Sequence, residues 1–579
     1  MEAAALTGFD RTDNVSSGHA VAGHGTDRED ELAAKIIADF NYLFGLRGNW
    51  NTHWTEIAQR IYPDHSYLFQ NYSQITQMGD KRMTQVYDST GILALQRFGA
   101  ILDSLLTPRN QFWHQLRAND PALNRDKETR LWFEKVNQIV FDQRYAQRSN
   151  FASQNQEQYL SLGAYGTGAL LIDDLAGDLG IRYRNVHLGQ LYLQENHQGI
   201  VDRVIRYFIM TARQAVQKFK DACPEQISSV ATDQPDRQFF IIHWVGPNED
   251  RDPFKRDYRG MPFASYYVSI EGRKLVAKGG YRRFPYAISR YRQAPFEAYG
   301  RSPAMDVLPA IKTLNEEKKT MLKAGHRALD PVLLAHDDGV IDAFSLEPGS
   351  VNAGGITKDG RLLIQPLPVG NIPEGKELME DERKLINDTF LVNLFQILTE
   401  NPEMTATEVM ERTREKGILL APTIGRQQSE YLGPMIDREL DILARQGLLP
   451  PQPRMLRSAK GQYKIIYDTP ISRAQKADQV SGALRTLEAF MQYAQGTQDP
   501  SVLHLINMDI AGPAIADANG VPISWMNSPQ RVKQLRQHAA KMQQAQLAIQ
   551  AAPAAAGVIK AKAAAGQLPQ QQQQQQRTG

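Results

Sequence analysis

Residues 302–329 read SPAMDVLPAIKTLNEEKKTMLKAGHRAL, and this stretch decides the fold that the sequence predicts. Ser302 is a residue that caps helices, and Pro303 suits the first helical position because its missing N–H would have no partner there. The pair Asp330-Pro331 ends the pattern after about 28 residues, which corresponds to a helix of ~40 Å. The sequence therefore predicts one unusually long helix here.

A second long helix is predicted over residues 376–398. Residues 332–375 lie between the two helices, are rich in Gly and Pro, and contain short apolar runs. Such a composition is typical of a small insert with β-structure. Two long helices that bracket a compact insert are the most distinctive feature of the chain.

The chain that precedes the first long helix is predicted to have a helical part followed by a part with strands. Helical spacing of apolar residues predicts several helices between residues 31 and 165. From about 165 to 290, short aromatic and β-branched runs are separated by Gly, Pro, Asp or Asn, which indicates an antiparallel sheet region with one helix inserted at 211–220. The predicted fold class is α+β.

After the second long helix the pattern stays mainly helical. A bend is predicted at Gly433-Pro434, a strand at 464–470 and a helix at 472–495. Near the C-terminus a short seam of coiled-coil type has the spacing 3-4-3-4-3. Its members are Val532, Leu535, Ala539, Met542, Gln546 and Ile549.

Charge and cysteine content exclude several classes of protein. The chain has 66 Lys and Arg against 64 Asp and Glu, whereas a protein that grips DNA through phosphates usually has a basic excess. Its single cysteine, Cys223, allows no intrachain disulfide and no zinc site built on thiolates. No apolar run is long enough for a membrane span, and the N-terminus is unlike a secretory signal.

Catalytic motifs are nearly absent from the sequence. There is no phosphate loop for ATP, and Gly163, Gly166 and Gly168 give the reverse of a dinucleotide fingerprint, so a turn or close backbone packing is the better interpretation. The carboxylate pairs Asp173-Asp174 and Asp337-Asp338 could serve a metal, and Asp173-Asp174 a metal-dependent nuclease, but each pair sits where a turn is expected, and a turn is the preferred interpretation. No catalytic residue, metal site or cofactor is predicted.

Two basic features are candidates for contacts with DNA or protein. Residues 281–301 interleave arginines with aromatic residues, a mixture that suits stacking on nucleic acid but also a subunit interface, which is the preferred interpretation. The candidates in this segment are Arg282, Arg283, Arg290, Arg292 and Arg301. Near the C-terminus, where no Asp or Glu follows Asp517, the candidates are Arg531, Lys533, Arg536 and Lys541.

The order of these elements resembles the head-tail connector, or portal, proteins of short-tailed bacteriophages. The resemblance is carried by WNTHWTEIAQRIYPDHSYLF, by VYDSTGILALQRFGAILDSLLTPRNQFWHQL, by NFASQNQEQYLSLGAYGTGALLIDD and by FPYAISRYRQAPFEAYGRSPAMDVLPAIKTLNEEKKTML. It covers roughly residues 31–500 and is specific in sum rather than in any single motif.

The resemblance implies the portal architecture of an α/β wing, two stem helices, a small clip, a helical crown and a possible C-terminal barrel. It implies the following divisions: wing (31–301), first stem helix (302–331), clip (332–375), second stem helix (376–398), tunnel loop with bent helix and wing return strand (399–471) and crown (472–526). Outside the resemblance, composition predicts a disordered N-terminus (1–30) and a disordered Ala/Gln-rich tail (551–579), and the coiled-coil seam predicts a C-terminal helix (527–550). The implied channel candidates are Thr399, Glu400, Asn401, Glu403 and Met404.

The resemblance also implies a function and a set of partners. Such a protein forms a homododecameric ring at one capsid vertex, lets double-stranded DNA pass during packaging and ejection, and has no enzymatic activity. Its implied partners are the terminase large subunit, tail adaptor and tail tube proteins, and the major capsid and scaffolding proteins, with no membrane contact. It works in the virion after assembly in the host cytoplasm. The alternatives are a tail adaptor, a DNA-binding scaffold or the nuclease named above.

Overall fold

The computed structural model describes residues 4–5, 21–22, 27–66, 69, 81–175, 177–220, 223–335, 345, 347–351, 355–368, 372–392, 420–459, 461–468, 470–497, 501, 505–518, 521, 525–527 and 530–545. Contacts along the chain separate two compact units. The first comprises residues 1–119 with 135–476, and the second comprises residues 120–134 with 477–579.

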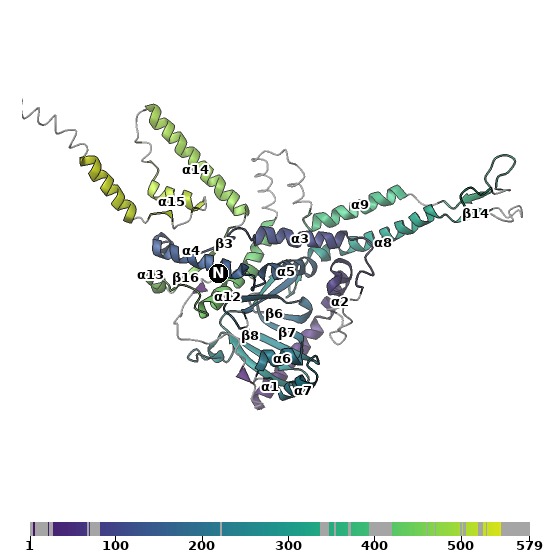
Figure 1. Ribbon diagram of the computed structural model, residues 1–579, viewed down its shortest axis with the longest axis horizontal. Coiled ribbons are helices and arrows are strands. Elements are labelled where there is room, and N and C mark those ends of the chain that lie inside the picture. The colour runs from purple at the N-terminus through teal and green to yellow at the C-terminus, as the bar shows by residue number, and fades with distance from the viewer. Residues whose placement is uncertain are drawn as a thin grey trace, which may run out of the picture. The chain divides into compact units, whose positions relative to one another are not determined.

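The largest sheet of the first unit has six strands, and every neighbouring pair is antiparallel. In spatial order the strands are β2 (Val21–Ala22), β10 (Lys274–Tyr281), β9 (Phe263–Ser269), β8 (Gln238–Pro247), β7 (Val201–Thr211) and β6 (Leu191–Glu195). Successive side chains of a strand point to opposite faces, so Ile242 packs with α1 (Asp27–Leu46) while Ile241 packs with α6 (Ala212–Phe219) and α7 (Glu225–Asp233). Helices therefore cover both faces of this sheet (Figure 1).

Four smaller sheets complete the strands among the described residues. They are β11 (Tyr286–Arg290) with β4 (Thr167–Asp174) and β5 (Ile181–Asn185), β1 (Ala4–Ala5) with β16 (Gln462–Tyr467) and β3 (His114–Ala118), β12 (Arg292–Gln293) with β13 (Gly300–Arg301), and β14 (Leu333–Ala335) with β15 (Ile364–Pro366). All of these pairs are antiparallel. The predicted α+β class and the predicted antiparallel region are confirmed.

Further α-helices and a π-helix belong to the first unit. They are α2 (Gly48–Ile61), α3 (Thr90–Leu106), α4 (Lys127–Tyr145, whose first eight residues belong to the second unit), α5 (Phe151–Tyr165), α8 (Pro303–Leu329), α9 (Ile372–Thr389), a π-helix (Gln427–Leu432), α12 (Gly433–Arg445) and α13 (Arg454–Ser458). The π-helix lies immediately before the bend predicted at Gly433-Pro434. Among the parts of the chain that the structure describes, no helix combines the length and the apolar content needed to cross a bilayer.

Three glycines of the chain allow close packing, as the sequence suggests. A Cβ atom on Gly163 would lie 2.7 Å from side-chain atoms of Leu95 and Phe98, and one on Gly168 would lie 2.5 Å from Gln158. Gly166 has φ +75°, and a Cβ atom there would lie 2.3 Å from the carbonyl oxygen of Gly300. The three glycines therefore join α5 to its neighbours and do not form a nucleotide loop.

The N-terminal region differs from the prediction of disorder over residues 1–30. The structure has β1 paired with β16, β2 paired with β10, and α1 beginning at Asp27, ahead of the predicted helical region from residue 31. Acidic residues in the first turn favour the positive end of the helix dipole, and Glu29 also forms an ion pair with Lys278 of β10. Composition alone could not show this partner, which lies on a distant strand.

The second unit is helical where it is described. α14 (Pro470–Thr497) enters it from the first unit, α15 (Met508–Ala518) follows, and residues 530–545 form a further helix. The seam residues Leu535 and Met542 lie on that last helix and are exposed, while Gln546 and Ile549 lie outside the described residues. The predicted tail at 551–579 also lies outside them.

Candidate functional site

α8 and α9 form a two-helix arm with the β14–β15 hairpin at its far end (Figure 1). Ser302 caps α8 by accepting a hydrogen bond from Met305 N at 3.1 Å, and its own hydroxyl donates to Ala164 O at 2.9 Å. The first half of α8 is buried as far as Asn315. Beyond that residue the arm leaves the core, and its outer half exposes large apolar side chains. These are Leu322, Leu329 and Leu378.

The base of the arm is tied to the segment that precedes α3. Asn315 Oδ1 accepts hydrogen bonds from the backbone N–H groups of Tyr87 at 2.7 Å and Asp88 at 3.1 Å. The carboxylate of Asp88 in turn accepts a hydrogen bond from Arg383 of α9 at 2.7 Å. Both helices of the arm are therefore fixed to one short stretch of backbone, which sets the direction in which the arm leaves the unit.

A groove of about 590 Å³ runs between the two helices of the arm. Met321, Gly375 and Leu378 give it an apolar floor, and the other lining residues are Lys312, Thr313, Glu316, Glu317 and Thr320. Burial, with the nearby carboxylate of Glu382 adding to it, raises the pKa of Glu317. An acidic and apolar groove does not suit a phosphate backbone, whereas it suits contact with another protein.

Arg290, one of the five arginines predicted in the segment 281–301, is buried in the centre of an ion-pair network. Its guanidinium donates to both carboxylate oxygens of Glu430 at 3.0 and 3.1 Å, to Glu195, and to the carbonyl oxygen of Gly199 at 3.1 Å. Glu430 lies in the π-helix, whose Gln427 also donates to Arg290 O at 3.0 Å. The network therefore joins β11 to the π-helix.

Arg292 and Arg301 of the same segment are also paired within the chain. Arg292 donates to Asp306 at 2.8 Å. Arg301 binds Glu297 and lies over the ring of Trp50 at 4.6 Å. Arg282 and Arg283 are half-buried at the end of β10. Since three of the five positive charges are neutralised internally, a contact with DNA through this segment is weakened, while a role at a subunit interface remains a prediction.

The other predicted candidates lie elsewhere. The C-terminal residues Arg531, Lys533, Arg536 and Lys541 lie on the helix at 530–545 of the second unit. Among them Arg536 is bidentate to Asp509 of α15, at 2.6 and 2.9 Å. The predicted channel residues lie outside the described residues, and so does the pair Asp337-Asp338; these channel residues are Thr399, Glu400, Asn401, Glu403 and Met404.

The carboxylates considered for a nuclease have partners that argue against a metal site. Asp173 and Asp174 end strand β4 and do not lie in a turn. Arg445 at the end of α12 and the next residue, Gln446, donate to Asp174 at 3.3 and 3.1 Å, and a guanidinium nitrogen of Arg438 lies 3.9 Å from Asp173. Within the described residues, no cluster of three or more His, Cys, Asp or Glu has metal-ligand geometry.

A buried ion pair that the sequence did not reveal joins α4 to α12. Arg144 Nε donates to Glu439 Oε1 at 2.9 Å, and the side chains of both residues are 0% exposed. Tyr183 donates to the same carboxylate at 2.6 Å, and the guanidinium lies 4.5 Å from the ring centre of Trp113. Charged residues are rarely buried unless paired, so this arrangement fixes how the two helices pack.

Buried histidines make the stability of the first unit dependent on pH. Burial lowers the pKa of His65 to about 4, and burial, with Arg144 adding to it, lowers the pKa of His114 well below 6.5. Neither ring nitrogen of His114 has a hydrogen-bond partner among the described residues. The unfolded chain takes up protons as pH falls through about 6.5 while the folded chain does not, so stability is full above that pH and is lost as pH falls towards 4.

We expect the free energy of unfolding to fall by about 2 kcal/mol for each fully buried histidine between pH 6.5 and 5. Urea unfolding followed by tryptophan fluorescence at several pH values measures this slope. His114→Phe removes one titrating group and should flatten the curve. An identical slope for the wild type and His114→Phe would contradict the prediction.

Comparison with known proteins places the chain in a family. Residues 33–526 match the family described as bacteriophage head to tail connecting protein. The chain is 28% identical over 532 residues to the portal protein of Salmonella phage epsilon15, covering 90% of this chain and 94% of that protein. It is 27% identical over 529 residues to the probable portal protein of Bordetella phage BPP-1, covering 88% and 91%.

A solved structure, the virion of a native gene transfer agent particle, is similar at 10% identity with a TM-score of 0.34, covering 69% of this chain and 86% of that chain. Similarity at this level supports no conclusion about this chain. Family membership follows from the match over residues 33–526 and from the two relatives, which align over nearly their whole lengths. The chain belongs to the family of bacteriophage head to tail connecting proteins.

Proposed function

We propose that this chain is the subunit of a closed homo-oligomeric ring, a dodecamer, through which DNA passes into and out of the capsid. Its function is the structural one of a portal protein in the virion, as its family and its two named relatives support. The ring, its subunit number and its individual partners are parts of the proposal. Catalytic activity is not part of it, since no recognisable catalytic motif occurs in the sequence.

The observation that carries the proposal is the arm formed by α8 and α9. Its outer half exposes Leu322, Leu329 and Leu378, and its tip is a two-stranded hairpin. A lone pair of helices gains most of its stability from packing an apolar face, and an isolated hairpin is marginal in water. Identical arms side by side in a ring would supply the missing contacts.

The elements correspond to the parts of a portal subunit as follows in this proposal. α8 and α9 are the stem helices, the segment with β14 and β15 is the clip, the other sheets belong to the wing, and α14 with α15 form the crown. The clip is the docking end for the terminase large subunit and then for the tail adaptor, because a hairpin at the far end of two long helices is exposed. Capsid and scaffolding proteins contact the rest of the ring in the host cytoplasm during assembly.

The near balance of 66 basic and 64 acidic residues agrees with a channel in which DNA moves. Binding through many phosphates would hold DNA by counterion release, and weak binding allows it to slide. An ATP-driven motor would then be a separate protein that docks on the ring.

Purified full-length protein at micromolar concentration should assemble into rings with a central pore, without nucleotide or DNA. Negative-stain class averages along the ring axis and mass photometry measure this. A tail adaptor or a DNA-binding scaffold would not require such a ring of this chain alone. A strictly monomeric protein at this concentration would contradict the proposal.

A further inference from the structure

A hairpin at Arg292–Arg301 carries an aromatic side chain in an unusual conformation. Phe296 is fully exposed and has φ +65°. For a bulky residue without a glycine's freedom, this left-handed backbone region is strained. Within the isolated chain, this exposed side chain therefore makes no packing contact that would offset the strain of its backbone.

The strain is imposed by a rigid frame at the base of the hairpin. Gly300 N donates to Thr167 Oγ1 at 2.7 Å, and the backbone of Gly300 packs directly on Gly166. On the other strand, Gln293 donates to Glu195 at 2.9 Å. Since both strands are anchored to β4 and β6, the loop between them is presented in one defined position.

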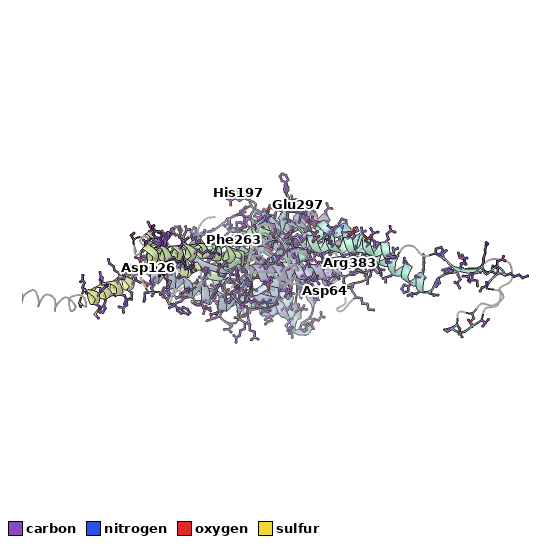
Figure 2. All side chains as sticks on the ribbon, turned by 90° about the horizontal axis from the view of Figure 1, so that it is seen from above. Asp64, Asp126, His197, Phe263, Glu297 and Arg383 are labelled. Carbon is purple, nitrogen blue, oxygen red and sulfur yellow. The ribbon has the colours of Figure 1, made fainter. Side chains whose placement is uncertain are left out.

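A second turn lies beside the hairpin and enlarges the surface. Residues 196–200 form a turn in which Asn196 N donates to Ile200 O, and Arg290 donates to Gly199 O. Figure 2 shows His197 of this turn and Glu297 of the hairpin projecting from the same side of the unit. Ile200 is more than half exposed there. Each turn exposes one large apolar side chain, Phe296 or Ile200, and the buried Arg290 network supports both turns through Glu195 and Gly199.

The charges around this surface are already paired, which indicates the kind of partner it fits. Glu297 binds Arg301, Asp306 binds Arg292, and Glu195 binds Arg290. A protein surface can cover such paired charges without leaving an uncompensated one, whereas a phosphate backbone would need cations that are not paired. The surface therefore suits a protein partner and not DNA.

We propose that Phe296 is the anchor by which each subunit binds the next copy of this chain, an inference that rests on the proposed ring. A closed ring with one subunit type joins two different surfaces of the chain, so a projecting side chain on one face inserts into the neighbour. Aromatic residues in the centre of an interface carry much of the binding energy. Packing into the neighbour also offsets the strain of the hairpin.

The test separates binding from folding with two variants and a control. Phe296→Ala keeps the strained backbone, while Phe296→Gly relieves it. Both should raise the concentration at half assembly by at least about tenfold, the effect of an interface hot spot. Phe296→Gly should also raise the melting temperature of the unassembled subunit. Phe254→Ala removes a similarly exposed phenylalanine, 94% exposed with an ordinary backbone, and should change neither quantity.

Mass photometry over a dilution series and differential scanning fluorimetry of the dilute protein supply the two measurements. Rings formed by the wild type and by both Phe296 variants at the same concentration would overturn this inference alone. Weaker DNA binding by the variants with unchanged assembly would overturn it as well. Absence of rings from the wild type would contradict the proposed function and, with it, this contact.

Discussion

Glu439→Ala should lower the free energy of unfolding by about 3–5 kcal/mol, because it leaves the buried guanidinium of Arg144 without its carboxylate. Neither side chain reaches water, so no solvent can replace the lost partner. Urea unfolding followed by tryptophan fluorescence reports the change directly, since the guanidinium lies against Trp113.

Two further variants make this measurement specific. Asp178→Ala breaks the exposed pair with Arg148 and should cost less than about 1 kcal/mol. The double variant Arg144→Met/Glu439→Leu removes both charges and should recover most of the stability lost in Glu439→Ala. Equal losses of unfolding free energy for Glu439→Ala and Asp178→Ala would show that the buried pair contributes no more to stability than the exposed one.

Gly166→Ala should lower the free energy of unfolding by at least about 3 kcal/mol, since a positive φ and a backbone collision act together. The new Cβ atom would lie 2.3 Å from Gly300 O, and no side-chain rotation can relieve a contact with backbone. Because Gly300 belongs to the hairpin at Arg292–Arg301, we also expect weaker assembly of this variant.

Gly177→Ala is the matched control for this second prediction. Gly177 has φ +81°, close to that of Gly166, but a Cβ atom on Gly177 would have no neighbouring atom within 4 Å. The free energy of unfolding of Gly177→Ala should therefore fall only by about 1–2 kcal/mol, which is the cost of a positive φ for alanine. Chemical denaturation of the two variants side by side gives the comparison, and equal losses would show that the contact with Gly300 is unimportant.

The long helix α8 could be predicted to within a residue because its signals are local. Ser302 and Pro303 mark its start, and the Asp330-Pro331 pair marks its end at Leu329. α9 begins at Ile372 and not at the predicted residue 376, because a proline in the first turn is tolerated there. Short aromatic and β-branched runs separated by Gly, Pro, Asp or Asn were likewise sufficient to predict the antiparallel region.

The ion pairs of the functional region could be predicted only in outline, because they join residues that are distant along the chain. The sequence drew attention to Arg290 as one of a group of arginines. Its partners Glu195 and Glu430 lie 95 and 140 positions away, so no local pattern connects them. The pair Arg144 and Glu439, 295 positions apart, was missed for the same reason. The sequence offered one signal for this pair, which is that the charged Glu439 falls among the apolar residues on the buried face of α12.

The π-helix at Gln427–Leu432 has a consequence for how the family can vary in length. A π turn accommodates one residue more than an α turn, and each residue of a helix advances its side chains by about 100°. The extra residue lets Glu430 face Arg290 while Met435 and Ile436 still face the core of the unit. Loss of one residue here would restore a continuous α-helix and rotate one flank against the other. Relatives that lack the residue must therefore carry compensating substitutions on one flank of the helix. An insertion or deletion at this turn should be accompanied by such substitutions.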